Sequence, residues 1–431
     1  TMKEEFLQYI WANSLYKGRG FTTHTGKNVQ ILHPGEANRN AGPDFFNARI
    51  QMNGLILAGN VEIHLKSSDW YNHGHHRDAA YNNVILSVVK TNDVRVYDSR
   101  KREVESVVLE FADDLYREYV FMRDARALPG CARRLGEMGN EWFHLTLPSL
   151  AVERLERKVE DIRRLLLLTG NDWEECFYRL LCRYWAGNVN AEAFQQLALN
   201  LPYKILLRYA GQLPVVEALI FGVSGLLGGA GEDEYVKVLK KEYAYYRAKH
   251  HLVEMPAQMW RFLRIRPGSF PTVRLALLAA FISRFRAVVP HLAGAGTVKE
   301  VIALFDTEAS AYWDTHYVFQ RESAARKKRM GKKLRQVLLI NALVPFLFIY
   351  GRMHGNEQLA EKALNWLEQT EPEDNSIVQT WTKCGFVFDS ALQTQALIQL
   401  QKEYCDHRLC LRCRVGREVL KSRSGIILSP E

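Results

Sequence analysis

The sequence lacks the features that mark secreted proteins. Its seven cysteines are an odd number in a chain of 431 residues, which does not fit a small disulfide-bonded secreted domain. No signal peptide is expected, because Lys3, Glu4 and Glu5 stand where an apolar segment would begin. We therefore expect a reducing, cytoplasmic compartment.

Long apolar runs are missing too. The longest one, residues 337–350, is interrupted by Asn341 and Pro345 and is shorter than the about 20 apolar residues that a membrane-spanning helix needs. This run predicts a buried helix, and no membrane partner is expected. No low-complexity segment and no repeat of fixed period is evident, so a solenoid is not expected either.

The totals favour a globular protein with an anionic partner. Hydrophobic residues make up 47% of the chain, which is enough for a large core and for two or three domains. Lys and Arg exceed Asp and Glu by 57 to 48, giving a formal net charge of +9. A basic surplus favours anionic partners such as nucleic acid or a membrane surface, but it does not specify a fold.

The part of the chain up to Phe111 has a mixed pattern. Two strand-like runs, 45–52 and 55–66, are joined by Asn53-Gly54, a strong signal for a two-residue β-hairpin turn. The nearly continuous apolar run 83–90 predicts a central strand. The remaining expected elements of this part are a helix at 4–15 and strands at 28–32, 93–97 and 103–110.

Beyond Phe111 the apolar spacing becomes helical and stays so. Ser149 is expected to cap a long helix at 150–168. The sequence thus predicts an α+β protein, with a small mixed α/β domain at 2–111 and an all-α region at 112–431. The other helices are expected at 112–126, 173–185, 190–199, 215–227, 234–250, 274–285, 298–305, 333–350, 356–368 and 389–404.

Candidate chemistry is concentrated on the predicted hairpin. Side chains alternate between the two faces of a strand, so Glu62, His64 and Lys66 share one face. A turn at Asn53-Gly54 places Asp44 opposite the region of Glu62 and Ile63. These groups could converge on one patch. The alternative is a solvated hairpin face on which Glu62 forms an ordinary cross-strand ion pair.

This hairpin resembles the PD-(D/E)xK nuclease superfamily. Pro43-Asp44 matches its PD element, and Glu62 matches the acid of the following strand. The resemblance implies a restriction-endonuclease-like core in which Asp44 and Glu62 bind Mg²⁺. The family pattern has Lys two residues after the acid, where this chain has His64. Either Lys66 or His64 would then position water or stabilise the phosphate.

Two neighbouring segments add polar groups to this region. The loop from Gly35 to Gly42 is small and polar, and loops of that kind often carry function. After the second strand come His73, His75, His76 and Asp78, which could bind metal or phosphate. Their spacing matches no defined zinc motif, and a histidine-rich surface turn is the alternative.

Three cysteines near the C-terminus form C-x4-C-x2-C, namely Cys405, Cys410 and Cys413. Such spacing can hold Zn²⁺ or an iron–sulfur cluster, although the nucleases of the resembled superfamily that carry a cluster space their cysteines differently. Cys384 and His407 are the candidates for a fourth ligand. Because neither is compelling, ordinary buried cysteines are the favoured interpretation. The other three cysteines, Cys131, Cys176 and Cys182, are expected in the core.

Basic residues gather at three places in the helical region. They surround the turn 266–271, open the helix near 326–333 and recur in the tail 408–423. Such clusters could follow a phosphate backbone or could be solvated helix faces. The stretches 62–70, 266–274 and 410–413 also resemble a bacterial family of large proteins of unknown function, and this resemblance implies a shared fold without residue roles.

The leading hypothesis is a metal-dependent nuclease acting on DNA or RNA. Asp44 and Glu62 would hold Mg²⁺, His64 and Lys66 would assist, and the helical region would bind nucleic acid. The alternative is a protein without catalytic activity, either a nucleic-acid-binding protein or a protein-assembly scaffold.

Overall fold

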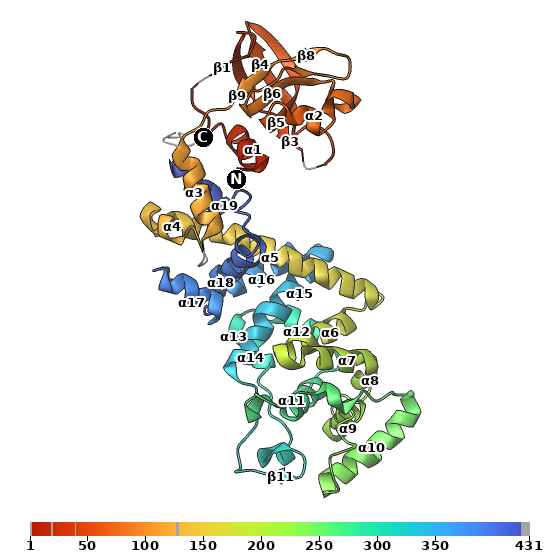
Figure 1. The fold of residues 1–431 in the computed structure, drawn as a ribbon. Coiled ribbons are helices and arrows are strands. Elements are labelled where there is room, and N and C mark those ends of the chain that lie inside the picture. The colour runs from red at the N-terminus through yellow and green to blue at the C-terminus, as the bar shows by residue number, and fades with distance from the viewer. Residues whose placement is uncertain (1, 19, 39, 126–128, 424–431) are drawn as a thin grey trace. The chain divides into compact units, whose positions relative to one another are not determined.

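The computed structural model describes residues 2–18, 20–38, 40–125 and 129–423. The chain divides into two compact units (Figure 1). Unit 1 comprises residues 1–146, 379–386 and 400–431, and unit 2 comprises residues 147–378 and 387–399. The expected boundary near Phe111 marks the end of the sheet in unit 1, whereas the compact unit extends beyond it and takes in C-terminal segments.

Unit 1 contains a mixed sheet with strand order β1-β2-β4-β5-β6-β9, and β3 pairs with β4 at one side. Strands β1 to β5 pair antiparallel, while β5, β6 and β9 are parallel. Helix α1 (Glu4–Ala12) packs on β5. The strands are β1 (Phe21–Thr22), β2 (Asn28–His33), β3 (Glu36–Ala37), β4 (Phe45–Met52), β5 (Leu55–Lys66), β6 (Val84–Thr91) and β9 (Ser106–Val108).

The β4–β5 hairpin confirms the turn and the register that the sequence predicts. Asn53 and Gly54 have φ values of 45° and 88°, as a type I′ turn requires. Met52 pairs with Leu55. Further along, the register shifts between Phe45 and Ala48, where Asn47 has a φ of 57°. This bulge turns the start of β4 and sets the position of the residue before it.

A compact crossover connects β5 to the parallel strand β6. Trp70 is fully buried in it and packs with Tyr81 in a small apolar cluster. Ser67 and Ser68 both hydrogen-bond to the Asp93 carboxylate, which ties the start of the crossover to the segment after β6. The crossover consists of α2 (Asp69–Asn72), η1 (His75–Arg77) and η2 (Ala79–Tyr81), and it is followed by the paired strands β7 (Val96–Tyr97) and β8 (Glu103–Val104).

Unit 1 also contains helices from both ends of the chain. Helix α19 (Arg414–Arg423) packs on α3 (Asp113–Asp124) and on α4 (Ala132–Met138), as Figure 1 shows for α3. The segment η8 (Leu400–Cys405) precedes α19. The sequence analysis missed α4 and α19, because both are short and their apolar faces become evident only when they pack together.

Unit 2 is built almost entirely of helices, but the expected all-α region is interrupted by a small hairpin, β10 (His316–Val318) and β11 (Arg321–Glu322). Helix α5 (Asn140–Leu168) begins earlier than predicted, so Ser149 lies inside it and is not its cap. The other helices of unit 2 are α6 (Trp173–Trp185), α7 (Ala191–Asn200), α8 (Tyr203–Leu207), α9 (Leu213–Val223), α10 (Glu234–His250), α11 (Pro271–Ser283), α12 (Val289–Gly294), α13 (Val298–Leu304), α16 (Glu357–Gln369) and α18 (Ala391–Gln399). Most of helix α17 (Ser376–Lys383) belongs to unit 1, which includes residues 379–386.

The helix that contains the longest apolar run is longer than the sequence suggested. It runs from α14 (Lys332–Leu338) through the π-helical turn η7 (Leu339–Leu343) into α15 (Val344–Met353). This helix has 22 residues and contains an 18-residue window with a mean hydropathy of 1.6, so by length and composition it could cross a membrane. The apolar run itself is as short as expected, but the helix that contains it extends beyond both of its ends. However, 72% of its most apolar window is buried inside the protein, as in the core helix of a folded domain.

Candidate metal and phosphodiester site

Asp44 and Glu62 are brought together at the bulged end of the hairpin, as the register predicts. The Asp44 main-chain N–H donates to Glu62 Oε2 at 2.9 Å. In return, the Asp44 carboxylate accepts the Ile63 N–H at 3.0 Å and the Gln8 side-chain amide of α1 at 2.9 Å. These bonds fix both carboxyl groups. The site therefore depends on α1, β4 and β5 together.

This acid pair is an electrostatically costly arrangement. Glu62 is only 5% exposed. Burial, and then the charge of Glu62, raises the pKa of Asp44 to about 7. The pKa of nearby Glu4 on α1 is also raised, chiefly by burial. Carboxylates that share a site disfavour each other's charged forms, and a bound cation would offset that cost.

His64 is buried beside Glu62 rather than exposed on a solvated face. Its side chain is 1% exposed, and its Nε2 lies 3.6 Å from Glu62 Oε1. Neither ring nitrogen has a hydrogen-bond partner among the described residues. Burial, reinforced by His75 and His73, lowers the pKa of His64 to about 3. The ring is therefore neutral near pH 7, which is the form that binds metals.

Three histidines converge next to Glu62. One possible ligand nitrogen from each of His64, His73 and His75 lies within 4.8 Å of the others. His75 Nε2 is 3.2 Å from Glu62 Oε1, although the two do not form a hydrogen bond. His75 is held by stacking on Tyr81, with ring centroids 3.8 Å apart. Three imidazoles and one carboxylate form a ligand set that suits transition metals.

Lys66 is not part of this cluster. Its side chain is exposed and forms no ion pair with Asp44 or Glu62, and its main-chain N–H donates to Asp69 Oδ2. It lies one strand repeat beyond His64, where β5 ends. Lys66 therefore does not neutralise the buried acids. The interpretation of the hairpin as a solvated face is wrong for Glu62 and His64 and right for Lys66.

A family model matches residues 4–376 of the chain, which include every residue of this site. The chain belongs to the family described as Protein of unknown function (DUF2851). No curated protein and no solved structure matches it. Membership in DUF2851 confirms the resemblance to a family of unknown function. The matched range ends before Cys405, so the C-terminal cysteines lie outside it.

The cysteines of this DUF2851 chain are arranged differently from the expectation. Cys405, Cys410 and Cys413 line one cavity of unit 1 together with Cys131. Cys384, one of the two expected candidates for a fourth ligand, is exposed and is not among the residues that line it. Cys131 is buried as expected, but its neighbours could not be known from the sequence, because more than half of the chain separates it from them.

Two of the predicted basic clusters meet in unit 2. The turn after Arg266 and the segment 326–333 line the same surface hollow of about 830 Å³. No acidic residue is among those lining it. Lys327 and Arg329 are paired with Glu308 nearby. The cationic residues that line the hollow are Arg266, Arg274, Arg326, Lys327, Lys328, Arg329 and Lys333.

The raised pKa of Asp44 predicts how the stability of the metal-free protein depends on pH. A carboxyl group whose folded pKa is raised contributes stability that is present below pH 3.8 and is lost as the pH rises to about 7. The rise in the pKa of Asp44 from 3.8 to about 7 corresponds to a loss of about 4 kcal/mol in the free energy of unfolding, at about 1.36 kcal/mol per pKa unit. We expect Asp44→Asn to become progressively more stable than the wild type between pH 4 and 7.

Urea unfolding in the presence of a chelator, measured for both proteins at each pH, checks this expectation. The exposed Glu110 gives a matched control, and Glu110→Gln is expected to leave the pH profile unchanged. The effect of His64 on stability has the opposite pH dependence, because its lowered pKa removes stability as the pH falls below 6.5. It is present in both proteins and cancels in the comparison. A stability difference that is the same at every pH would contradict the role given to Asp44.

Proposed function

We propose that this protein is a metal-dependent nuclease that hydrolyses phosphodiester bonds of DNA or RNA. The observation that carries the proposal is the position of Glu62, which lies between Asp44 on one side and the three histidines on the other. It is a buried carboxylate surrounded by groups that can bind a divalent ion. None of the Lys or Arg residues in the described chain forms an ion pair with it.

A divalent ion at this place would supply the chemistry that phosphodiester hydrolysis needs. Such an ion lowers the pKa of a bound water and stabilises the negative charge that develops on the phosphate. Asp44 and Glu62 would provide carboxylate ligands, and His64, His73 and His75 would provide imidazoles. Exposed Lys66 at the rim would neutralise charge on the phosphate.

The ligand set also bears on the choice of ion. Mg²⁺ prefers oxygen ligands and keeps several waters, which suits the acid pair alone. Imidazole ligands favour Zn²⁺, Fe²⁺ or another later first-row transition-metal ion. We therefore propose that a transition-metal ion supports the reaction at lower concentrations than Mg²⁺ does.

The order of elements in unit 1 supports a restriction-endonuclease-like core. Helix α1 is followed by the antiparallel strands β2, β4 and β5, and then by β6, which is parallel to β5. The acids stand at the end of the β4–β5 hairpin that lies away from its turn, where β5 pairs with the parallel strand β6. This order corresponds to the one that the PD-(D/E)xK resemblance implies.

The proposal is tested by supplying ions and substrates in turn. The chelator-treated protein is titrated calorimetrically with Mg²⁺, Mn²⁺ and Zn²⁺, and each mixture is then incubated with labelled single-stranded DNA, duplex DNA and RNA. We expect binding heat for at least one ion, and products only with an ion that binds. If none of the three substrates is cleaved with any ion, the protein is not a nuclease.

A second candidate function is nucleic-acid binding without cleavage. It is favoured by the basic hollow of unit 2, where Arg274 is largely buried and its pKa is lowered by that burial. A buried guanidinium whose Nε has no partner among the described residues is suited to an anion. Salt-sensitive binding without metal heat would favour this candidate. The absence of both metal heat and binding would favour a protein-assembly scaffold.

A further inference from the structure

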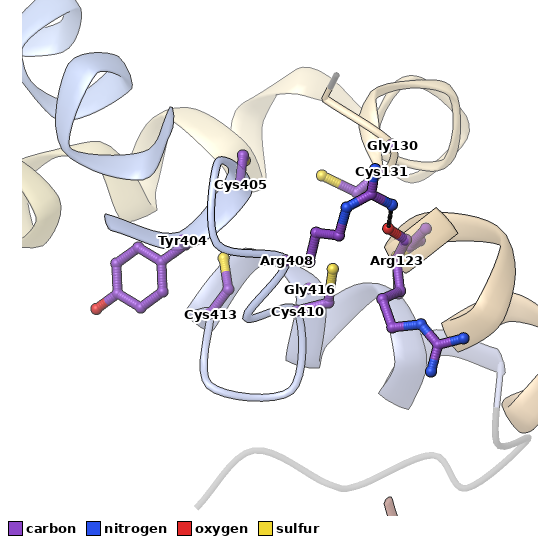
Figure 2. A pocket seen from close by; sticks show the side chains of 10 residues that line it. Arg123, Gly130, Cys131, Tyr404, Cys405, Arg408, Cys410, Cys413 and Gly416 are labelled. Carbon is purple, nitrogen blue, oxygen red and sulfur yellow. Dashed lines mark hydrogen bonds between the residues drawn. The ribbon is translucent and has the colours of Figure 1, made fainter. Parts of the chain in front are cut away.

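Four cysteines from distant parts of the sequence share one cavity of unit 1. Cys131 stands immediately before α4, Cys405 is the last residue of η8, and Cys410 and Cys413 lie between η8 and α19. Figure 2 shows the sulfur atoms of Cys131, Cys410 and Cys413 turned toward the same space. Cys405 lines the same cavity. Cys131, from a distant part of the chain, thus adds a fourth possible ligand to the three cysteines of the C-x4-C-x2-C pattern.

Segments of the main chain around the cavity approach each other closely at two glycines. A Cβ at Gly416 would lie 2.4 Å from the Cys410 carbonyl oxygen, and one at Gly130 would lie 2.3 Å from the Met122 carbonyl oxygen. Main-chain hydrogen bonds hold the segment between Cys405 and Cys413. The Arg408 N–H donates to the carbonyl oxygen of Cys405, and the Cys413 N–H donates to that of Leu409. Glycine at positions 130 and 416 lets the two parts of unit 1 meet at the cysteines.

The arrangement of the sulfur atoms argues against a single zinc ion. Zn–S bonds of about 2.3 Å place the four sulfur atoms of a tetrahedral site about 3.8 Å apart. Among the described residues, the potential ligand sets whose atoms all lie within 4.8 Å of one another include the three histidines and no set of three cysteines. In any three of these thiols, at least two sulfur atoms are therefore farther apart than one tetrahedral ion allows, whereas the thiolates of a multinuclear cluster are spread more widely.

The charges around the cavity also favour an anionic cluster. Arg123 and Arg408 are among the residues that line it (Figure 2). Arg408 donates a hydrogen bond to the main-chain carbonyl oxygen of Arg123, and this bond holds the Arg408 guanidinium group at the cavity. A cluster bound by four thiolates has a net negative charge, and the guanidinium group of Arg408 would stabilise it, whereas that of Arg123 is paired with Asp124.

We propose that Cys131, Cys405, Cys410 and Cys413 are the four thiolate ligands of an iron–sulfur cluster. On binding a preformed cluster, each thiol releases its proton to solvent as its sulfur bonds to iron, and no residue of the protein is oxidised or reduced. The cluster fastens the C-terminal segment to the α3–α4 part of unit 1. It uses none of the residues of the Glu62 site, so the two proposals stand or fall separately.

The proposal is tested on the full chain purified without oxygen. We expect about four iron atoms and about four acid-labile sulfides per chain, together with the broad visible absorbance of a thiolate-bound cluster. Stoichiometric zinc in place of iron would overturn the proposal, and so would a chain that contains neither metal. This measurement needs no variant, so it does not depend on whether a substituted protein folds.

Variants then identify the ligands. Cys131→Ala is expected to lose most of the iron and the visible absorbance. Its melting temperature should fall, because the cluster no longer links the C-terminal segment to the α3–α4 part of unit 1. Cys384→Ala is the matched control: it lies in the same unit, its side chain is exposed, and the iron content should be unchanged. Retention of full iron by Cys131→Ala, or equal loss in both variants, would overturn the assignment of the fourth ligand.

Discussion

Replacing Glu62 by Gln is expected to reduce metal-dependent cleavage by roughly 1,000-fold, because a metal ion contributes several kcal/mol of charge stabilisation at about 1.36 kcal/mol per tenfold in rate. The amide keeps the shape of the carboxylate and can still accept the hydrogen bond from the Asp44 N–H. It cannot provide a negatively charged metal ligand. Calorimetry with Mn²⁺ should show the loss of binding heat in parallel with the loss of activity.

Other substitutions in and around this site are expected to impair the protein in different ways. Asp44→Ala and Glu62→Ala should also abolish cleavage, but each leaves buried polar groups without partners and costs about 1–3 kcal/mol of stability. His75→Ala should raise the Mn²⁺ concentration that half-maximal activity requires. Lys66→Ala should lower the rate without changing metal binding, because its side chain is exposed and outside the cluster.

Glu110→Ala serves as the control for this series, since Glu110 is an exposed acid of the same unit. Its activity should equal that of the wild type. Nucleic-acid binding should persist in Glu62→Gln. Equal cleavage by wild type, Glu62→Gln and Asp44→Ala would show that this site does not carry the reaction.

The local features of this fold could be predicted from the sequence. The Asn53-Gly54 turn determined the hairpin, and the alternation of residues along it determined the register. The bulge at Asn47 could not be foreseen, yet it shifts the register by only one residue and leaves Asp44 opposite Glu62 and Ile63. Helices α6 and α10 begin and end where their apolar spacing predicts.

What the sequence could not show depends on contacts between distant segments. His73 and His75 lie in the tight crossover in which Trp70 is fully buried, so their approach to His64 is a tertiary effect. The only signal was the density of histidine after the hairpin. Cys131 has no sequence signal at all, because a cysteine before a short helix resembles any other core residue.

Helix α5 illustrates a different limit. Pro148 lies inside it, and the helix continues on both sides of this residue even though proline has no main-chain N–H to donate. A proline inside a helical pattern usually ends or kinks the helix, so the sequence predicted a boundary at Ser149 where the helix in fact continues.

Reversing the charges that line the basic hollow of unit 2 is expected to reduce nucleic-acid affinity strongly. Arg266, Arg326 and Lys333 are exposed and form no ion pair among the described residues. They are therefore available for phosphate. A hydrogen bond to a charged group is worth about 1.5–3 kcal/mol, so removing three such contacts should weaken binding by at least roughly 1,000-fold.

The salt dependence of binding distinguishes phosphate contacts from other effects. Each lost phosphate contact lowers the slope of log affinity against log salt by about 0.9 on duplex DNA and by about 0.7 on a single strand. Binding is measured by fluorescence anisotropy at several salt concentrations. The triple variant Arg266→Glu, Arg326→Glu and Lys333→Glu should show a slope smaller by about 2 to 3.

A matched triple variant separates the hollow from the overall charge of the protein. Lys204, Lys237 and Lys241 are exposed residues of the same unit and do not line the hollow. Their replacement by Glu changes the net charge by the same amount, yet it should reduce affinity and slope much less. If both triple variants lose affinity equally, binding depends on the net charge of +9 and not on this hollow. If neither loses affinity, the nucleic acid is bound elsewhere on the protein.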